Sequence, residues 1–185
     1  VIAGGQAQRV ADAIPQEQLD ALPLGRLDFI GMNIYNSVMV RAGANGKPEF
    51  CPRAAGHPRT AIGWPVTPES MEWGTRFVWE RYGLPIYITE NGISCTDSIH
   101  LDGKVHDPAR IDFIHRYLLS LRRAIDGGVD VRGYFHWSLL DNFEWSEGYN
   151  ERFGLIYLDY ATGKRTPKDS AVWYANVAET NGKNL

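Results

Sequence analysis

The sequence predicts an α/β protein whose parallel strands are joined by helices. Three apolar, β-rich segments, each ending in polar or aromatic residues, alternate with two long helical patterns. Strand, helix and strand in succession favour a parallel pair joined by a right-handed crossover. No internal repeat, low-complexity tract or linker divides the chain, so we expect residues 1–185 to form a single unit.

The expected strands cover residues 27–35, 85–90 and 131–140. The middle run, PIYITE, lacks polar alternation, so we expect it to be buried on both faces. It ends at Glu90, and Asn91-Gly92 is a turn dipeptide that takes the chain out of the sheet. Such a carboxylate is either a local cap or a reactive group, because α/β proteins place reactive groups at the carboxyl ends of their strands.

Two helices are expected, over residues 67–84 and 107–128. The first begins with Thr67 as its N-cap, followed by a proline at the first helical position, and ends at Gly83. The second begins at an Asp-Pro pair and ends at a Gly-Gly pair. Its apolar residues fall on one helical stripe, formed by Ile111, Ile114, Leu118, Leu121 and Ile125.

Two further regions are less regular. Residues 43–63 are rich in Gly, Pro and Ala and are expected to form a long loop, which is uncommon unless the loop is functional. Towards the end of the chain, two short extended pieces flank Thr162-Gly163, and a last helix is entered at Thr166-Pro167.

The composition is that of an ordinary globular protein, with 44% hydrophobic and 22% charged residues and a net charge of -3. Basic pairs such as Arg122-Arg123 are isolated, so we expect neither nucleic acid nor a membrane as partner. The first 16 residues lack the order of a signal peptide. Cys51 and Cys95 form neither a disulfide framework nor a metal site. We therefore expect a cytoplasmic protein without metal or cofactor.

Three motifs carry a resemblance to a known family. They are FIGMNIYNS at 29–37, ITENG at 88–92 and VRGYFHWSLLDNFEWSEGYNERFG at 131–154. Together they resemble the carboxyl-terminal part of glycoside hydrolase family 1, the β-glucosidase family, from about Leu27 to Tyr174. The resemblance implies a (β/α)8 TIM barrel. Because a closed barrel takes about 250 residues, the chain corresponds to only part of one, about strands 6 to 8.

The resemblance also implies the catalytic residues. Glu90 would be the nucleophile of a retaining glycosidase, which needs an ionised carboxylate close to the anomeric carbon. Tyr35 would donate a hydrogen bond that steadies this carboxylate, and Asn33 would lie at the same site. Taken alone, Tyr35 would be more typical of a core tyrosine.

The same resemblance places the sugar. Trp137 would lie beneath the pyranose, Glu144 would accept hydrogen bonds from the C4 and C6 hydroxyls, and Trp145 would lie beside the C3 and C4 hydroxyls. Phe153 would close the pocket, and Trp64 would lie on the aglycone side unless it is a plain loop anchor. These residue types suit a sugar, whose C–H face packs on indole and whose hydroxyls prefer charged acceptors.

Glu144 separates two kinds of substrate. The 6-phospho-β-glycosidases replace this Glu-Trp pair, because a carboxylate aimed at C6 would repel a phosphate. We therefore expect a β-glucoside or short β-linked oligosaccharide without phosphate.

The family's acid/base motif, Thr-x-Asn-Glu-Pro, is absent from the 185 residues. A retaining glycosidase needs two carboxylates about 5 to 5.5 Å apart, so we expect the second on an N-terminal part of the barrel. The main hypothesis is thus part of a retaining β-glucosidase that releases terminal non-reducing β-D-glucosyl residues. The alternatives are a catalytically inactive sugar-binding or interaction fragment of the same fold, and a partial barrel that oligomerises to cover its open edges.

Overall fold

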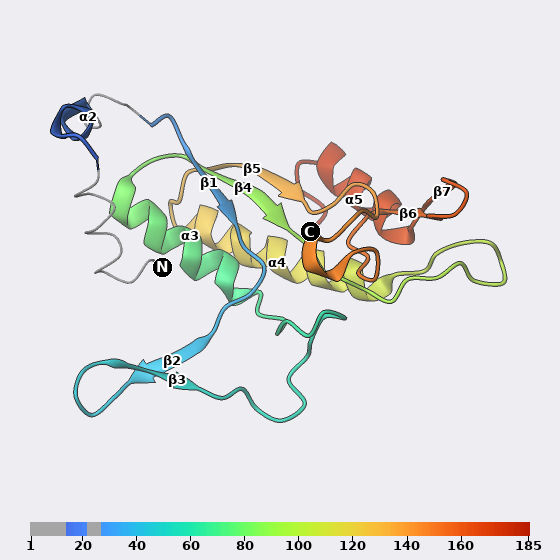
Figure 1. Cartoon of the computed structure of the whole chain (residues 1–185), viewed down its shortest axis with the longest axis horizontal. Coiled ribbons are helices and arrows are strands. Elements are labelled where there is room, and N and C mark those ends of the chain that lie inside the picture. Colours follow the sequence, from blue (N-terminus) through green and yellow to red (C-terminus); the bar gives the residue numbers. More distant parts are fainter. Residues whose placement is uncertain (1–13, 22–26) are drawn as a thin grey trace.

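The computed structural model describes residues 14–21 and 27–185. At its centre is a parallel sheet of three strands in the order β1-β4-β5 (Figure 1). These strands are β1 (Ile30–Asn33), β4 (Ile86–Asn91) and β5 (Val131–His136). The predicted alternation of strand and helix is confirmed. Residues 1–13, on which the expected lack of a signal peptide largely depends, lie outside the described residues.

Helix α3 (Glu69–Tyr82) follows the first strand and α4 (Pro108–Asp126) follows the second. The two helices pack against each other and against one face of the sheet, and α5 (Asp169–Glu179) packs against α4. A short helix, α2 (Gln16–Ala21), precedes the first strand. The buried core between helices and sheet is apolar and includes Met71, Ile86, Ile88, Phe113, Ile114 and Leu121.

For the two long helices, three of the four predicted ends are right and one is wrong. Helix α3 ends at Gly83, whose φ of 63° is the left-handed conformation that glycine adopts at helix ends. Helix α4 matches its predicted span. Thr67, however, is not the N-cap: its hydroxyl accepts a hydrogen bond from the Ser37 backbone N–H at 2.8 Å, and Pro68 occupies the cap position.

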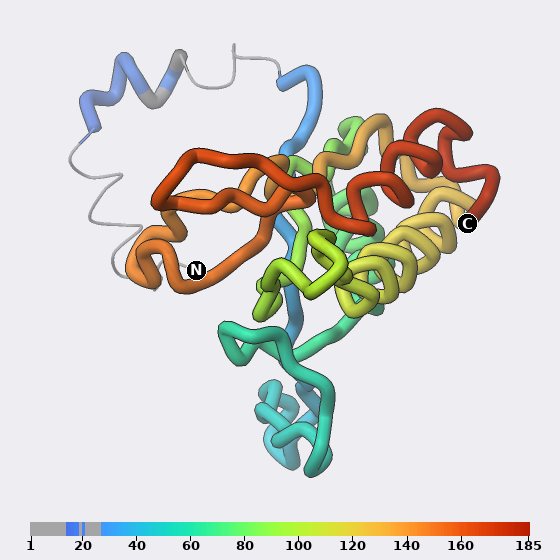
Figure 2. Tube along the Cα trace, turned by 90° about the vertical axis from the view of Figure 1, so that its right-hand side faces the viewer, coloured from blue at the N-terminus to red at the C-terminus, as the bar shows by residue number. Residues whose placement is uncertain are grey.

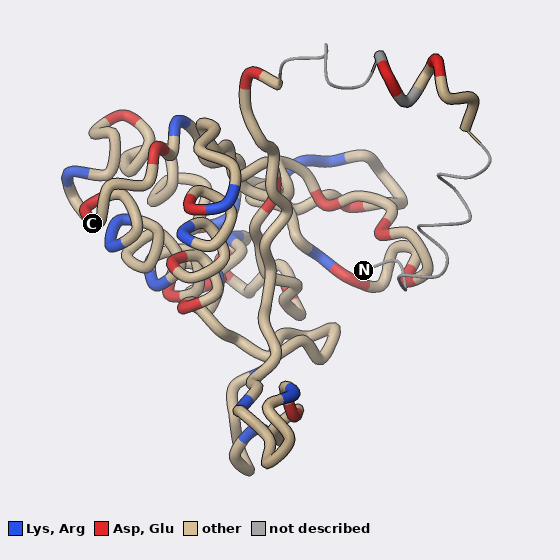
Figure 3. The backbone as a smooth tube through the Cα atoms, turned by 90° about the vertical axis from the view of Figure 1, so that its left-hand side faces the viewer, with Lys and Arg blue, Asp and Glu red and all other residues tan. Residues whose placement is uncertain are grey.

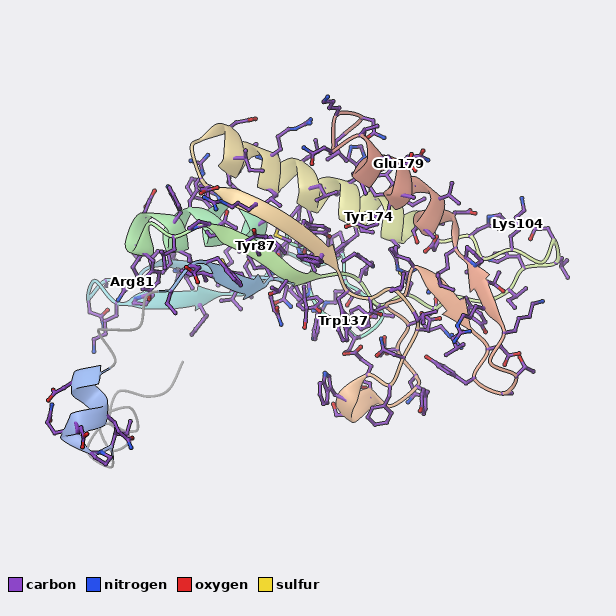
Figure 4. The ribbon with its side chains drawn as sticks, turned by 90° about the horizontal axis from the view of Figure 1, so that it is seen from above. Arg81, Tyr87, Lys104, Trp137, Tyr174 and Glu179 are labelled. Carbon is purple, nitrogen blue, oxygen red and sulfur yellow. The ribbon has the colours of Figure 1, made fainter. Side chains whose placement is uncertain are left out.

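Only one face of the middle strand is buried. Ile86 and Ile88 are buried under the helices, whereas Thr89 is exposed and Tyr87 is half-buried on the opposite face. The prediction that both faces are buried is therefore wrong for this chain, because no described element covers the second face (Figure 4). The side chain of Phe135 on the neighbouring strand is exposed as well.

The expected loop at 43–63 contains part of a hairpin. Strand β2 (Met39–Ala42) pairs antiparallel with β3 (Pro48–Cys51). The hairpin projects away from the helices and the sheet (Figure 2). Its turn contains Asn45-Gly46, with Gly46 at φ 74°, and an Asn-Gly pair is a strong local signal for a hairpin.

The carboxyl-terminal part contains a second hairpin. Strands β6 (Ile156–Leu158) and β7 (Arg165–Pro167) pair antiparallel on either side of the predicted turn at Thr162-Gly163. Thr166-Pro167 belongs to β7, and helix α5 begins two residues later than predicted. In the described part of the chain, no helix has the length and apolar character needed to cross a bilayer. Basic and acidic segments are interleaved over the helical side (Figure 3), in agreement with ion pairs such as Arg123–Glu72.

Candidate active site

Glu90 lies near the carboxyl end of the middle strand. Its neighbour in the register of the first strand is Asn33, after an irregularity that begins at Met32. The Glu90 carbonyl accepts a hydrogen bond from the Ile34 N–H at 2.9 Å. Its carboxylate Oε2 accepts a hydrogen bond from the Tyr35 hydroxyl at 2.8 Å. The structure thus contains the hydrogen bond that the resemblance implies, between residues 55 positions apart in the chain.

Asn91, beside Glu90, ties the three strands together. Its Nδ2 donates to the Ile34 carbonyl at 2.8 Å, and its Oδ1 accepts from the Tyr134 hydroxyl at 2.7 Å. Its own carbonyl accepts from the Trp137 N–H at 2.8 Å. The side chain has no exposed surface. The prediction that the chain leaves the sheet directly after Glu90 is wrong by one residue, because Asn91 is the last residue of β4 and its amide is used as a buried cross-link within the sheet.

Gly92 allows two segments to approach closely. A Cβ atom at this position would lie 1.9 Å from the Trp137 carbonyl oxygen, far inside van der Waals contact. Only glycine permits this approach without a shift of the backbone. The close approach brings Trp137, one residue beyond β5, next to the end of the strand that carries Glu90 (Figure 4).

Aromatic rings surround the Tyr35 side chain. The Tyr35 ring meets Trp64 edge-on with centroids 5.3 Å apart and meets Phe153 at 6.3 Å, and Trp64 lies 6.1 Å from Phe153. Phe153 is only 2% exposed. Burial raises the pKa of the Tyr35 phenol far above its usual range, and the hydrogen bond to Glu90 acts in the same direction. Tyr35 therefore remains a protonated donor at all physiological pH values.

Trp137 and Glu144 form a second pair. The indole Nε1–H of Trp137 donates to Glu144 Oε2 at 3.1 Å, and the peptide bond that follows Trp137 is cis. The Glu144 charge also contributes to the raised pKa of Tyr35, so the pair lies within electrostatic reach of the Glu90–Tyr35 pair. Among residues 14–21 and 27–185, no ion pair involves Glu144.

Two predicted site residues lie at the margin. The Asn33 side chain is exposed on the open face of the sheet, where its Oδ1 accepts from the Thr89 hydroxyl at 2.6 Å. Trp145 is 78% exposed and has a φ of 46°, an uncommon value outside glycine. It opens a short 3₁₀ turn, Trp145–Glu147, and has no aromatic partner in the described part of the chain.

The arrangement suits carbohydrate chemistry. A steadied carboxylate, indole and phenyl faces and a second carboxylate lie at one end of the sheet. Within the described residues, no group of three or more His, Cys, Asp or Glu side chains could hold a metal ion. Sequence reasoning missed the roles of Asn91 and Gly92, because only the cross-strand contacts reveal them.

Comparisons with known proteins point in the same direction. The model of glycosyl hydrolase family 1 matches residues 4–183. Over 160 residues, 85% of this chain, the sequence is 46% identical to beta-glucosidase A of Thermotoga maritima, of which the match covers 35%. It is 39% identical over 168 residues to a bifunctional beta-D-glucosidase/beta-D-fucosidase of Bifidobacterium breve. A 6-phospho-beta-galactosidase of Streptococcus equi subsp. zooepidemicus is 38% identical over 174 residues.

Solved structures extend the match to three dimensions. The chain superimposes on the Thermotoga maritima beta-glucosidase in complex with glucoimidazole with a TM-score of 0.81 and 42% identity, covering 93% of this chain and 39% of that one. The complex with castanospermine gives a TM-score of 0.82. The chain thus spans about a third of the length of the curated relatives it matches. It belongs to glycosyl hydrolase family 1, and its three parallel strands and their helices are part of that family's (β/α)8 barrel.

Proposed function

We propose that this chain carries the nucleophile and the sugar-binding residues of a β-glucosidase that hydrolyses terminal β-D-glucosyl residues with retention of configuration. The observation that carries the proposal is the 2.8 Å hydrogen bond from the Tyr35 hydroxyl to Glu90 Oε2 at the carboxyl end of a barrel strand. In that position the carboxylate has one oxygen held by a donor and the other free to attack.

In the proposed reaction, Glu90 attacks the anomeric carbon. A glycosyl ester bond forms as the bond to the aglycone oxygen breaks, and the leaving oxygen takes a proton from a general acid. Water then attacks the ester and gives a proton to the same group, now a base. We propose that polypeptide outside these 185 residues supplies this second carboxylate, since they contain no Asn-Glu-Pro motif.

Glu144 supports a neutral sugar as the substrate. It accepts from the Trp137 indole and has no ion-pair partner in the described part of the chain. We propose that its carboxylate accepts hydrogen bonds from the C4 and C6 hydroxyls while Trp137 packs against the sugar face. A phosphate on C6 would meet an uncompensated negative charge there, so a 6-phosphoglycoside should be a poor substrate.

Trapping of the covalent intermediate tests the proposal. The full-length protein that carries this chain is incubated with 2,4-dinitrophenyl 2-deoxy-2-fluoro-β-D-glucoside, and the labelled peptide is identified by mass spectrometry. We expect one label, on Glu90, and none in the Glu90→Gln variant. A label on another residue would overturn the assignment. Sugar binding without label or turnover would favour a sugar-binding protein instead.

A further inference from the structure

A cluster of buried charges lies beside the segment that carries the sugar-binding residues. It contains three carboxylates and three cations, so its formal charges cancel. The side chains are fully or largely buried, with Arg110, Lys168, Asp107 and Asp141 completely so. The six residues of this buried charge cluster are Asp97, Asp107, Arg110, Asp141, Arg152 and Lys168.

Asp141 joins the two ends of the sugar-binding segment. Its Oδ1 accepts from the Gly154 N–H at 3.0 Å and from the Lys168 ammonium at 2.8 Å. Its Oδ2 accepts from the Arg152 guanidinium at 2.6 Å. Residues 141–154 therefore form a loop closed by one carboxylate. Glu144 lies three residues after its start, and Phe153 immediately precedes its end.

Lys168 connects this loop to the segment that follows Glu90. Its ammonium is 2.6 Å from Asp97 Oδ2 as well as 2.8 Å from Asp141. Asp97 lies six positions after Asn91, on the chain that leaves the middle strand. Arg110 holds the same segment, because it donates to Asp97 at 2.7 Å and to the Arg152 carbonyl at 2.9 Å.

The placement of these charges argues for a role in geometry. Burying ion pairs costs desolvation energy that the attraction between the charges only partly offsets, so apolar residues would serve simple packing as well. All six charges lie outside the three central strands, and they connect the chain after Glu90 to the chain around Glu144. The distance between Glu90 and Glu144 decides whether a sugar held by Glu144 presents its anomeric carbon to Glu90.

We propose that Asp141 and Lys168 are positioning residues that hold Glu144 in register with Glu90, so that they set the preference for sugars bearing a C6 hydroxymethyl group. The inference rests on the proposed function. The inference goes beyond that function by assigning substrate discrimination to two buried residues that are not among the proposed sugar contacts.

The test compares two substrates in the full-length protein. p-Nitrophenyl β-D-xyloside lacks the C6 hydroxymethyl group of p-nitrophenyl β-D-glucoside, so a displaced Glu144 should affect the glucoside more. For Asp141→Asn and Lys168→Met, normalised by active-site titration, we expect kcat/KM for the glucoside to fall about tenfold or more, and the glucoside-to-xyloside ratio to fall about fivefold. Glu144→Ala should lower the glucoside-to-xyloside ratio as well, and its effect gives the change expected when the Glu144 contact is lost completely.

Two further variants complete the design. Asp112→Asn removes a surface ion pair with Arg116, in which both side chains are 61% exposed, and should change neither substrate's kcat/KM. Arg152→Gln weakens the Asp141 anchor at a partly exposed position and provides a readout if the other variants do not fold. An unchanged substrate ratio in the folded variants would overturn the inference, because a purely structural role lowers both activities equally. A wild-type protein that hydrolyses neither substrate would instead refute the proposed function.

Discussion

Replacing Tyr35 with phenylalanine isolates the hydrogen bond to Glu90. The change removes one oxygen, which lies 2.8 Å from the carboxylate, and keeps the ring that contacts Trp64 and Phe153. The backbone around it should not move, because the Tyr35 carbonyl still accepts from the Tyr117 hydroxyl at 2.8 Å. The variant therefore reports on the orientation of the Glu90 carboxylate alone.

The expected magnitude follows from the type of bond. A hydrogen bond to a charged group is worth about 1.5 to 3 kcal/mol. Without it the Glu90 carboxylate is no longer held in the orientation needed for attack, and the activation free energy should rise by about this amount. Since every addition of about 1.4 kcal/mol to the activation barrier slows a reaction about tenfold, kcat/KM should fall about 10- to 150-fold. Because burial raises the pKa of Tyr35 far above its usual range, the wild-type protein keeps this donor throughout the pH range of the assay.

The assay is hydrolysis of p-nitrophenyl β-D-glucoside by the full-length protein, normalised by active-site titration. Tyr134→Phe is the matched control, since it removes a phenol that donates to Asn91 at 2.7 Å rather than to the carboxylate. That variant should lower thermal stability and keep kcat/KM within about threefold. A Tyr35→Phe loss smaller than that of the control would refute the role given to Tyr35.

Three other substitutions test separate parts of the structure. Glu144→Ala should lower kcat/KM on the glucoside by about 2 to 5 kcal/mol, as expected for a charged acceptor that becomes covered by the sugar, and a loss below about 1 kcal/mol would make the residue peripheral. Gly92→Ala places a Cβ 1.9 Å from a backbone carbonyl oxygen and should cost about 3 kcal/mol in urea unfolding, whereas Gly74→Ala, with 3.7 Å of clearance in a helix, should not destabilise. The pKa of His106 is raised, foremost by its hydrogen bond to Asp169, so the stability it contributes is full below about pH 6.5 and is lost as pH rises through the raised pKa. The melting temperature of His106→Gln should therefore lie furthest below wild type in acid, and an equal difference at alkaline pH would contradict this reasoning.

Local signals predicted the regular elements well. Helix α3 ends at Gly83 and α4 begins at Pro108 because backbone conformation at those positions is set by the residue itself. The Thr67 prediction was wrong because its hydroxyl has a partner 30 residues earlier in the chain. The prediction that both faces of the middle strand are buried was wrong at Thr89. An apolar run indicates a strand that is covered on both faces in a whole barrel, whereas the described residues of this chain cover only one face.

The candidate site shows the same division. A carboxylate at a strand end is visible in the sequence, and the resemblance added Tyr35 as its donor. The roles of Asn91 and Lys168 are not visible in the sequence, because their partners are remote. The two partners of Asn91 lie 43 and 57 residues away, and Asp97, which pairs with Lys168, lies 71 residues away. A polar residue whose partner is remote looks in sequence like any solvent-exposed polar residue.

The Asn91 cross-link also bears on how the sheet opens. Strand ends usually fray, and their amide protons exchange with solvent sooner than those in the middle. Here the carboxyl end of the middle strand is joined to both neighbours, through the Ile34 carbonyl on one side and the Tyr134 hydroxyl on the other. Local opening should therefore begin at the opposite end of the strands. The end that carries Glu90 should keep its amide protons longest, while the opposite end of the strands exchanges first.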